Sequence, residues 1–365
     1  MTPARVLIVE DSAVMRTLVC ELIEADPRLR VAAAVDRVES ALDLVRRGSA
    51  DVVSLDLRLP GMTGMDFIAA AMSEHPVPIV VLSSALGRGG LSAIQALRAG
   101  AVAVVEKPPS PHDPSFERAG ATLCTQLAIM SGLRLVRRRD GAVPAAAAPP
   151  DPPPGPPLGA FRSSVLGVVA STGGPRALER LFNVIGRPLD APILLVQHMT
   201  PAFVENFVTW LGSVVPMPVV LARHGEAPRH GLIHMAPPGA HLELRRGLLA
   251  VGGSDPVDGH APSGTVLLRS LAEETGGAAA GVVLTGMGVD GAAGLARIRE
   301  AGGATFAEDP STAVVDGMPG AARRLGAARW VLPLDELGTT LPGLFSPPRP
   351  PPSLERRQSQ PKEIP

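Results

Sequence analysis

The sequence predicts two α/β domains, each with a parallel sheet covered by helices. The chain has 365 residues, and at roughly 150 residues per domain this length favours two domains. Short β-branched and apolar runs alternate with amphipathic stretches, which is the pattern of repeated β-α-β units. The 39 prolines are unevenly spread, with eight between Pro144 and Pro157 and eight between Pro342 and Pro365. These two segments therefore indicate a linker and a tail.

The N-terminal part of the chain contains five predicted strands with helices between them. The strands are expected at Arg5–Val9, Arg30–Val35, Val52–Leu55, Ile79–Leu82 and Val102–Val105. The helices are expected to begin near Ser12, Glu39, Thr63, Gly89 and Ser115. Residues 1–132 are thus predicted to form a doubly wound domain. Residues 133–162 begin with a basic turn and continue as a Pro/Ala tract, which predicts an extended linker.

A second alternating series predicts a second α/β domain over residues 163–342. Its main strands are expected at Val165–Ala170, Pro192–Val196, Val219–Ala222, Ala279–Thr285 and Ala304–Ala307. Three short, Gly-separated pieces lie between these runs and predict a small antiparallel ribbon. They are Ile233–Met235, His241–Leu244 and Leu248–Val251. Residues 343–365 are Pro-rich and charged and are expected to be a disordered tail.

Composition excludes several classes of protein. Lys and Arg total 34 against 35 Asp and Glu, so the net charge of −1 provides no basic surface for nucleic acid or an anionic membrane. Tyr is absent and aromatic residues make up 3%, which disfavours stacking platforms for single-stranded nucleic acid. Cys20 and Cys124 form no disulfide framework or zinc motif, and neither a secretory signal nor an 18-residue apolar run is present. We therefore expect a cytoplasmic protein.

Acidic, hydroxyl and basic side chains follow the predicted strands of the first domain. They are Glu10 and Asp11 after the first strand, Asp56 after the third, Ser83 after the fourth and Lys107 after the fifth. Because ligands bind beyond the carboxyl ends of parallel strands, these groups are expected to converge. Clustered carboxylates and a phosphate oxygen suit Mg²⁺, so Asp56 could accept a phosphoryl group. Taken singly, each carboxylate could also be a solvated strand-end or helix-cap residue.

This region resembles the receiver domain of two-component response regulators. The matching segments are VLIVEDSAVMR, SLDLRLPGMTGMDF, VVLSS and GAVAVVEKPP. The resemblance implies a flavodoxin-like fold, a cognate histidine kinase and Mg²⁺ as a cofactor of phosphorylation. It implies Glu10, Asp11 and Asp56 as Mg²⁺ ligands, Asp56 as phosphoacceptor, Ser83 as the hydroxyl that follows the phosphoryl group, and Lys107 as its counter-charge. The chain departs from this pattern at Val104, where an aromatic residue is frequent, and in its Glu-Asp acid pair.

In the second domain a serine, a histidine and an aspartate follow three predicted strands. Ser171 lies in the turn Ser171–Pro175, where glycines permit a tight turn and Pro175 suits a helix start. His198 and Asp290 follow later strands, so the three side chains could form a proton relay. Singly, Ser171 or Asp290 could cap a helix and His198 could be a hydrogen-bonded strand-end residue. The turn lacks the lysine of a P-loop, and no G-x-S-x-G motif is present, which disfavours nucleotide binding and an α/β-hydrolase.

Four segments together resemble the catalytic domain of the chemotaxis protein-glutamate methylesterase family (CheB). They are STGGP at 171–175, QHM at 197–199, LTGMG with DG at 284–291, and AEDP through GMP at 307–319. The resemblance implies hydrolysis of glutamyl γ-methyl esters on methyl-accepting chemotaxis receptors, with release of methanol and no cofactor for the esterase. Deamidation of receptor glutamines is often a second activity of this family. The implied roles are Ser171 as nucleophile, His198 as general base and then acid, Asp290 as its orienting carboxylate, and the Met287 N–H as oxyanion donor.

One motif departs from the family: His260-Ala261-Pro262-Ser263 stands where His-Arg-Pro-Ser is frequent. His230 and His234 are four residues apart, but Gly231 and nearby prolines indicate a strand, so we expect no metal site there.

A non-catalytic, phosphorylation-gated binding domain is the alternative function for the second domain, and the Ser/His/Asp set argues against it. A DNA-binding regulator would need a basic element in the C-terminal half, which is missing. We expect peripheral association with receptors rather than membrane insertion, and a receiver domain that obstructs Ser171 until Asp56 is phosphorylated.

Overall fold

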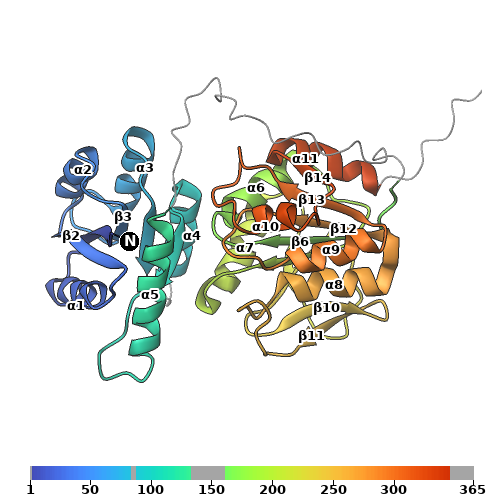
Figure 1. The fold of residues 1–365 in the computed structure, drawn as a ribbon, viewed down its shortest axis with the longest axis horizontal. Coiled ribbons are helices and arrows are strands. Elements are labelled where there is room, and N and C mark those ends of the chain that lie inside the picture. Colours follow the sequence, from blue (N-terminus) through green and yellow to red (C-terminus); the bar gives the residue numbers. More distant parts are fainter. Residues whose placement is uncertain (1, 84–87, 133–160, 346–365) are drawn as a thin grey trace, which may run out of the picture.

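The computed structural model describes residues 2–83, 88–132 and 161–345. These residues form two α/β domains that lie side by side (Figure 1). Most of the predicted linker at 133–162 and of the predicted tail at 343–365 lies outside the described residues. Among the described helices, none is both long enough and apolar enough to cross a membrane.

The N-terminal domain is a five-stranded parallel sheet in the order β2-β1-β3-β4-β5. The strands are β1 Ala4–Val9, β2 Leu29–Val35, β3 Val52–Asp56, β4 Ile79–Ser83 and β5 Ala103–Glu106. The helices are α1 Ala13–Glu24, α2 Val38–Arg46, α3 Gly64–Glu74, α4 Arg88–Ala99 and α5 Phe116–Met130. All residues of β3 and β4 are buried, because helices cover both faces of the sheet. The five predicted strands are confirmed.

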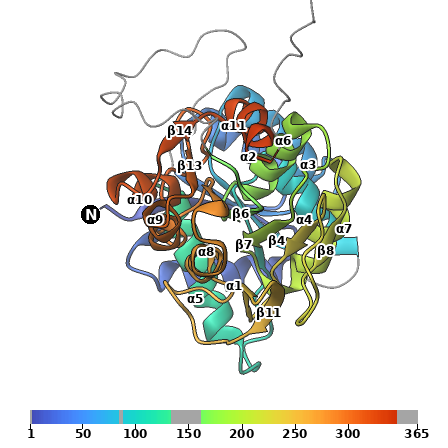
Figure 2. The same cartoon turned by 90° about the vertical axis from the view of Figure 1, so that its right-hand side faces the viewer.

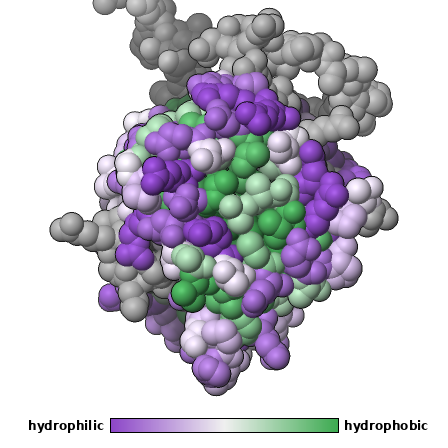
Figure 3. Space-filling view, turned by 90° about the vertical axis from the view of Figure 1, so that its left-hand side faces the viewer, coloured by the Kyte–Doolittle hydropathy of each residue, from purple (hydrophilic) through white to green (hydrophobic). Residues whose placement is uncertain are grey.

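Strand β2 lies at one edge of this sheet and is less buried than the inner strands β3 and β4. Leu29 is buried, but the following residues Arg30–Val35 are half-buried or exposed. Figure 3 views the side of the molecule on which α1, α2 and β2 lie and shows a band of apolar side chains bordered by polar ones. The other side of the N-terminal domain, with α4, faces the second domain (Figure 1).

The C-terminal domain is a seven-stranded parallel sheet in the order β14-β13-β12-β6-β7-β9-β8. The strands are β6 Val165–Ala170, β7 Ile193–Gln197, β8 Val219–Leu221, β9 Ile233–Met235, β12 Ala279–Val283, β13 Ala304–Glu308 and β14 Trp330–Leu332. The helices are α6 Gly174–Ile185, α7 Val204–Val214, α8 Gly264–Thr275, α9 Ala292–Glu300, α10 Met318–Arg324 and α11 Leu334–Thr340. Helices α6 and α7 lie on one side of β6 and β7, and α8, α9 and α10 lie on the other (Figure 2).

The antiparallel ribbon contains two strands, β10 His241–Arg245 and β11 Leu248–Gly252. The prediction that Ile233–Met235 belongs to this ribbon is wrong. This segment is β9, which pairs in parallel with both β7 and β8. All three of its residues are buried, as expected for a strand inside a parallel sheet. Strand β14 was not predicted; it forms one edge of the seven-stranded sheet, and β8 forms the other.

The two domains meet through α4. This helix contacts α6, α7 and the short helix η2 Pro201–Phe203. Ile94 of α4 is 1% exposed and belongs to the same apolar cluster as the core of the C-terminal domain. Arg98 of α4 forms an ion pair with Glu179 of α6 at 3.1 Å. Apolar burial of Ile94 and the Arg98–Glu179 ion pair therefore hold α4 against the C-terminal domain.

Candidate active site

Ser171 lies in the turn between β6 and α6. Its carbonyl oxygen accepts a hydrogen bond from Gln197 Nε2 at 2.8 Å, and the same amide donates to the carbonyl of His198 at 2.9 Å. Gly173 has φ 79°, and a Cβ at Gly174 would collide with the Gln197 side chain. Only glycine fits these two positions, which explains the Gly-Gly pair of the turn. The N-cap of α6 is Gly173 and makes no side-chain cap bond, so Ser171 does not cap this helix.

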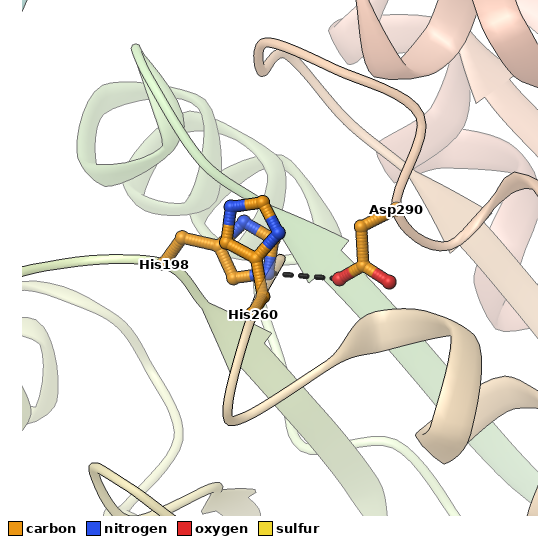
Figure 4. Close-up of side chains that lie close together, drawn as sticks. All are labelled: His198, His260 and Asp290. Carbon is orange, nitrogen blue, oxygen red and sulfur yellow. Dashed lines mark hydrogen bonds and ion pairs between the residues drawn. The ribbon is translucent and has the colours of Figure 1, made fainter. Parts of the chain in front are cut away.

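His198 follows β7 and bonds directly to Asp290. Its Nε2 lies 2.9 Å from Asp290 Oδ2 (Figure 4), and its side chain is 8% exposed. Nδ1 is buried and has no hydrogen-bond partner among the described residues. With Nε2 committed to the carboxylate, Nδ1 is the ring nitrogen that can take a proton from a neighbouring hydroxyl. Ser171 and His198 line the same cavity.

Asp290 is fully buried and accepts hydrogen bonds from three groups besides His198. The Ser263 hydroxyl and the Thr265 N–H donate to Oδ1 at 2.7 and 2.9 Å, and the Gly264 N–H donates to Oδ2 at 2.6 Å. Ser263 is the N-cap of α8, so the carboxylate lies at the positive end of that helix dipole. Burial raises the pKa of Asp290, but the hydrogen bonds from His198, Ser263 and Thr265 outweigh it and hold that pKa well below its usual range.

The loop after β12 passes close to Ser171. A Cβ at Gly286 would lie 2.7 Å from Ser171 Cβ, so the backbone approaches this closely only because the residue is glycine. The next residue is Met287, whose N–H has no acceptor among the described residues. This position suits an oxyanion donor, which needs an N–H that no protein acceptor takes.

Glu308 and Thr285 hold this loop in place. Glu308 ends β13, is fully buried, and its Oε2 accepts the Thr285 N–H at 2.7 Å. The Thr285 hydroxyl donates to the Thr172 carbonyl at 2.9 Å and accepts the Val315 N–H at 2.9 Å. Burial raises the pKa of Glu308 to about 7. The role of Glu308 was not predicted from the sequence, although this residue lies in the AEDP segment.

The acidic residues predicted in the N-terminal domain also converge. Carboxylate oxygens of Glu10, Asp11 and Asp56 all lie within 4.8 Å of one another. Lys107 Nζ donates to Asp56 Oδ2 at 2.7 Å and to Glu10 Oε2 at 2.8 Å. Glu10 and Asp56 are buried and Asp11 is exposed; burial raises the pKa of Glu10, and Lys107 opposes that shift. Three carboxylates with an exposed side fit the oxygen ligands that Mg²⁺ prefers.

Ser83 ends β4 beside this acidic cluster. Its carbonyl accepts the Lys107 N–H at 3.0 Å, so strand pairing places the serine next to the lysine. Val104, which replaces the frequent aromatic residue, lies on β5 and lines the cavity that Ser171 and His198 also line. The N-terminal domain therefore closes one side of the cavity over the C-terminal site.

Comparison with known proteins identifies the family. The CheB methylesterase family model matches residues 166–341, and the response regulator receiver domain model matches residues 6–113. A protein-glutamate methylesterase/protein-glutamine glutaminase 2 of Paramagnetospirillum magneticum is 44% identical over 341 residues, which cover 92% of this chain and 96% of that protein. The chain belongs to the CheB methylesterase family.

Another family member, protein-glutamate methylesterase/protein-glutamine glutaminase 3 of Anaeromyxobacter dehalogenans, is 41% identical over 92% of this chain and 98% of that protein. Among solved structures, the CheB methylesterase catalytic domain of Thermotoga maritima is 34% identical, with a TM-score of 0.48, and covers 50% of this chain and 98% of that one. The domain order of this CheB-family chain, receiver first and methylesterase second, is the one predicted from its motifs.

Proposed function

We propose that this CheB-family protein is a phosphorylation-activated serine esterase that hydrolyses glutamyl γ-methyl esters on methyl-accepting chemotaxis receptors and releases methanol. The observation that carries this proposal is the buried His198–Asp290 pair, which lies beside the Ser171 turn and uses only one nitrogen of the imidazole. This arrangement leaves the second nitrogen as a base for a nearby hydroxyl.

In the first half of the reaction, the Ser171 oxygen forms a bond to the ester carbonyl carbon while His198 Nδ1 takes the serine proton. The negative charge that develops on the carbonyl oxygen is stabilised by the Met287 N–H. When the carbonyl re-forms, the bond to the methoxy oxygen breaks, and His198 returns the proton so that methanol leaves. Asp290 holds the imidazole and stabilises its protonated form throughout.

In the second half, water attacks the acyl-enzyme with His198 again acting as base, which frees Ser171 and the receptor glutamate. Attack on a glutamine amide would follow the same steps, with ammonia as the leaving group. We therefore propose deamidation as a second reaction of the same site. The chemistry needs only the three side chains and backbone donors, so we propose no cofactor for the esterase.

We propose that phosphorylation of Asp56 regulates access to this site. Glu10, Asp11 and Asp56 would hold Mg²⁺, which supplies positive charge to the phosphoryl oxygens when bound. Lys107 would pair with the new phosphoryl charge and give up its contact with Asp56, and Ser83 would follow the phosphoryl group. Because α4 and β5 close the cavity above Ser171, loosening their contact would admit a receptor segment.

The partners that fit this function are a cognate histidine kinase and the cytoplasmic parts of chemoreceptors. We therefore propose a cytoplasmic location with peripheral association at receptors. The test is methanol release from receptor membranes carrying methyl-labelled glutamates, measured with and without acetyl phosphate and Mg²⁺. We expect release above background and stimulation by the phosphodonor. No release above background with phosphorylated protein would contradict the proposed function.

A further inference from the structure

We propose that His260 is a positioning residue that fixes the imidazole of His198 by stacking on its face. This inference rests on the proposed role of His198 as the base. The two rings lie 3.8 Å apart between centroids, and their planes differ by 8° (Figure 4). His198 is thus held at its edge by Asp290 and over one face by His260.

His260 lies at the end of a tight turn. Val257 and His260 exchange two backbone hydrogen bonds at 3.0 and 3.1 Å, which closes a two-residue turn at Asp258 and Gly259. These residues have φ 52° and 80°, and the Asp-Gly pair is one that tolerates left-handed backbone at both positions. The Asp258 carbonyl then accepts a hydrogen bond from His260 Nδ1 at 2.8 Å, which fixes the ring orientation.

The same turn is connected to the residues that hold Asp290. The Thr265 hydroxyl donates to Asp258 Oδ2 at 2.9 Å and accepts the Gly291 N–H at 2.8 Å. The Thr265 N–H donates to Asp290 Oδ1. One helix start therefore positions both contacts of His198, its edge partner and its stacking partner.

A metal site does not explain this cluster. Ligand atoms of His198, His260 and Asp290 lie within 4.8 Å of one another, which is close enough to share an ion. The lone pair of an imidazole nitrogen lies in the ring plane, however, and two nearly parallel planes 3.8 Å apart do not meet at one ion. Asp290 is also already occupied by four donors. The parallel arrangement of the two rings is therefore explained by stacking of His260 on His198.

Stacking matters because His198 must take a proton from one oxygen and deliver it to another without turning away. His260 covers one face of the His198 ring and so blocks displacement of the ring toward that side. Burial and the neighbouring His198 lower the pKa of His260, so it is neutral at pH 7 and offers a π face to the imidazolium that forms during turnover. The titratable groups that face His260 are His198, Asp290 and Asp258, and the described residues lining the cavity add no other titratable side chain.

The test compares three variants of the full chain, phosphorylated with acetyl phosphate, in the methanol-release assay. His260→Ala removes the ring, His260→Leu replaces it with a bulky side chain that is not planar, and His260→Phe restores a flat ring without nitrogens. We expect Ala and Leu to lower kcat on the order of tenfold or more, with KM little changed. We expect Phe to recover most of kcat. Thermal unfolding of each variant checks that it is folded.

Several outcomes would overturn the inference. If Phe is as slow as Leu, His260 acts through its nitrogens and not through stacking. If all three variants keep wild-type kcat, the stack has no role in turnover, and if only KM rises, His260 is a substrate contact. Ser171→Ala is run alongside: activity in that variant would contradict the proposed function itself, whereas an inactive Ser171→Ala with unaffected His260 variants would contradict only this inference.

Discussion

Replacing Asp290 by Asn is the most informative single change, because the structure predicts which way the amide turns. An NH₂ group in the place of Oδ2 would face the Gly264 N–H and His198 Nε2–H, both donors. In the place of Oδ1 it would face the Thr265 N–H and the Ser263 hydroxyl, and the hydroxyl can rotate to accept. We therefore expect the amide oxygen to face His198.

The two consequences differ in size. One donor, the Thr265 N–H, loses its acceptor in a buried place, which costs about 1–3 kcal/mol of folding free energy. His198 keeps its tautomer but loses the negative charge that stabilises its protonated form, so we expect kcat to fall about 10²- to 10⁴-fold. Loss of the nucleophile in serine hydrolases costs about 10⁶-fold. Asp290→Asn should therefore be milder than Ser171→Ala.

The assays are methanol release and denaturant unfolding at several pH values. The pKa of Asp290 is lowered in the folded protein, so its carboxylate contributes stability above the ordinary Asp pKa of about 4, and this contribution is lost as pH falls below that value. The stability difference between wild type and Asp290→Asn should therefore shrink in acid. Wild-type activity in this variant would refute the role of Asp290. Activity as low as that of Ser171→Ala would refute the predicted amide orientation.

Three other predictions concern regulation and the loop near Ser171. Acetyl phosphate and Mg²⁺ should label the chain once, as an acyl phosphate, and Asp56→Asn should take no label; undiminished labelling would contradict the phosphoacceptor assignment. Because the pKa of Glu308 is raised to about 7, the folded protein keeps the Glu308 proton at pH values where the unfolded chain has lost it. The stability that this proton contributes is fully present below the ordinary Glu pKa and is lost as pH rises through 7. Urea unfolding between pH 5 and 8 should show wild type losing roughly 3 kcal/mol relative to Glu308→Gln, and parallel curves would contradict the shift. A fragment of residues 161–345 should release methanol faster than the unphosphorylated full chain and should not respond to phosphodonor, whereas equal rates would contradict obstruction by α4.

Much of the site was predictable because functional side chains lie beyond the carboxyl ends of parallel strands. Ser171, His198 and Asp290 each follow a strand of one parallel sheet, so local sequence patterns were enough to bring them to one edge. The same rule placed Glu10, Asp56 and Lys107 around one point.

Residues whose roles depend on distant partners were not predictable in this way. Ser263 and Glu308 act through hydrogen bonds to residues 27 and 23 positions away, and no local pattern reports such pairs. The stacking of His260 on His198 depends on the path of a loop, and β9 was misassigned because its three residues carry too little periodicity to separate a sheet strand from a ribbon strand.

The most direct test of the central claim is methanol release by the phosphorylated full chain and its Ser171→Ala variant on the same methyl-labelled receptor membranes. Ser213→Ala is the matched control, because Ser213 is an exposed serine at the end of α7 that does not line the cavity. We predict that Ser213→Ala keeps wild-type activity. Ser171→Ala, once thermal unfolding has shown that it is folded, should retain less than about a tenth of that activity. A Ser171→Ala variant that releases methanol at more than that rate would contradict the assignment of Ser171 as the nucleophile.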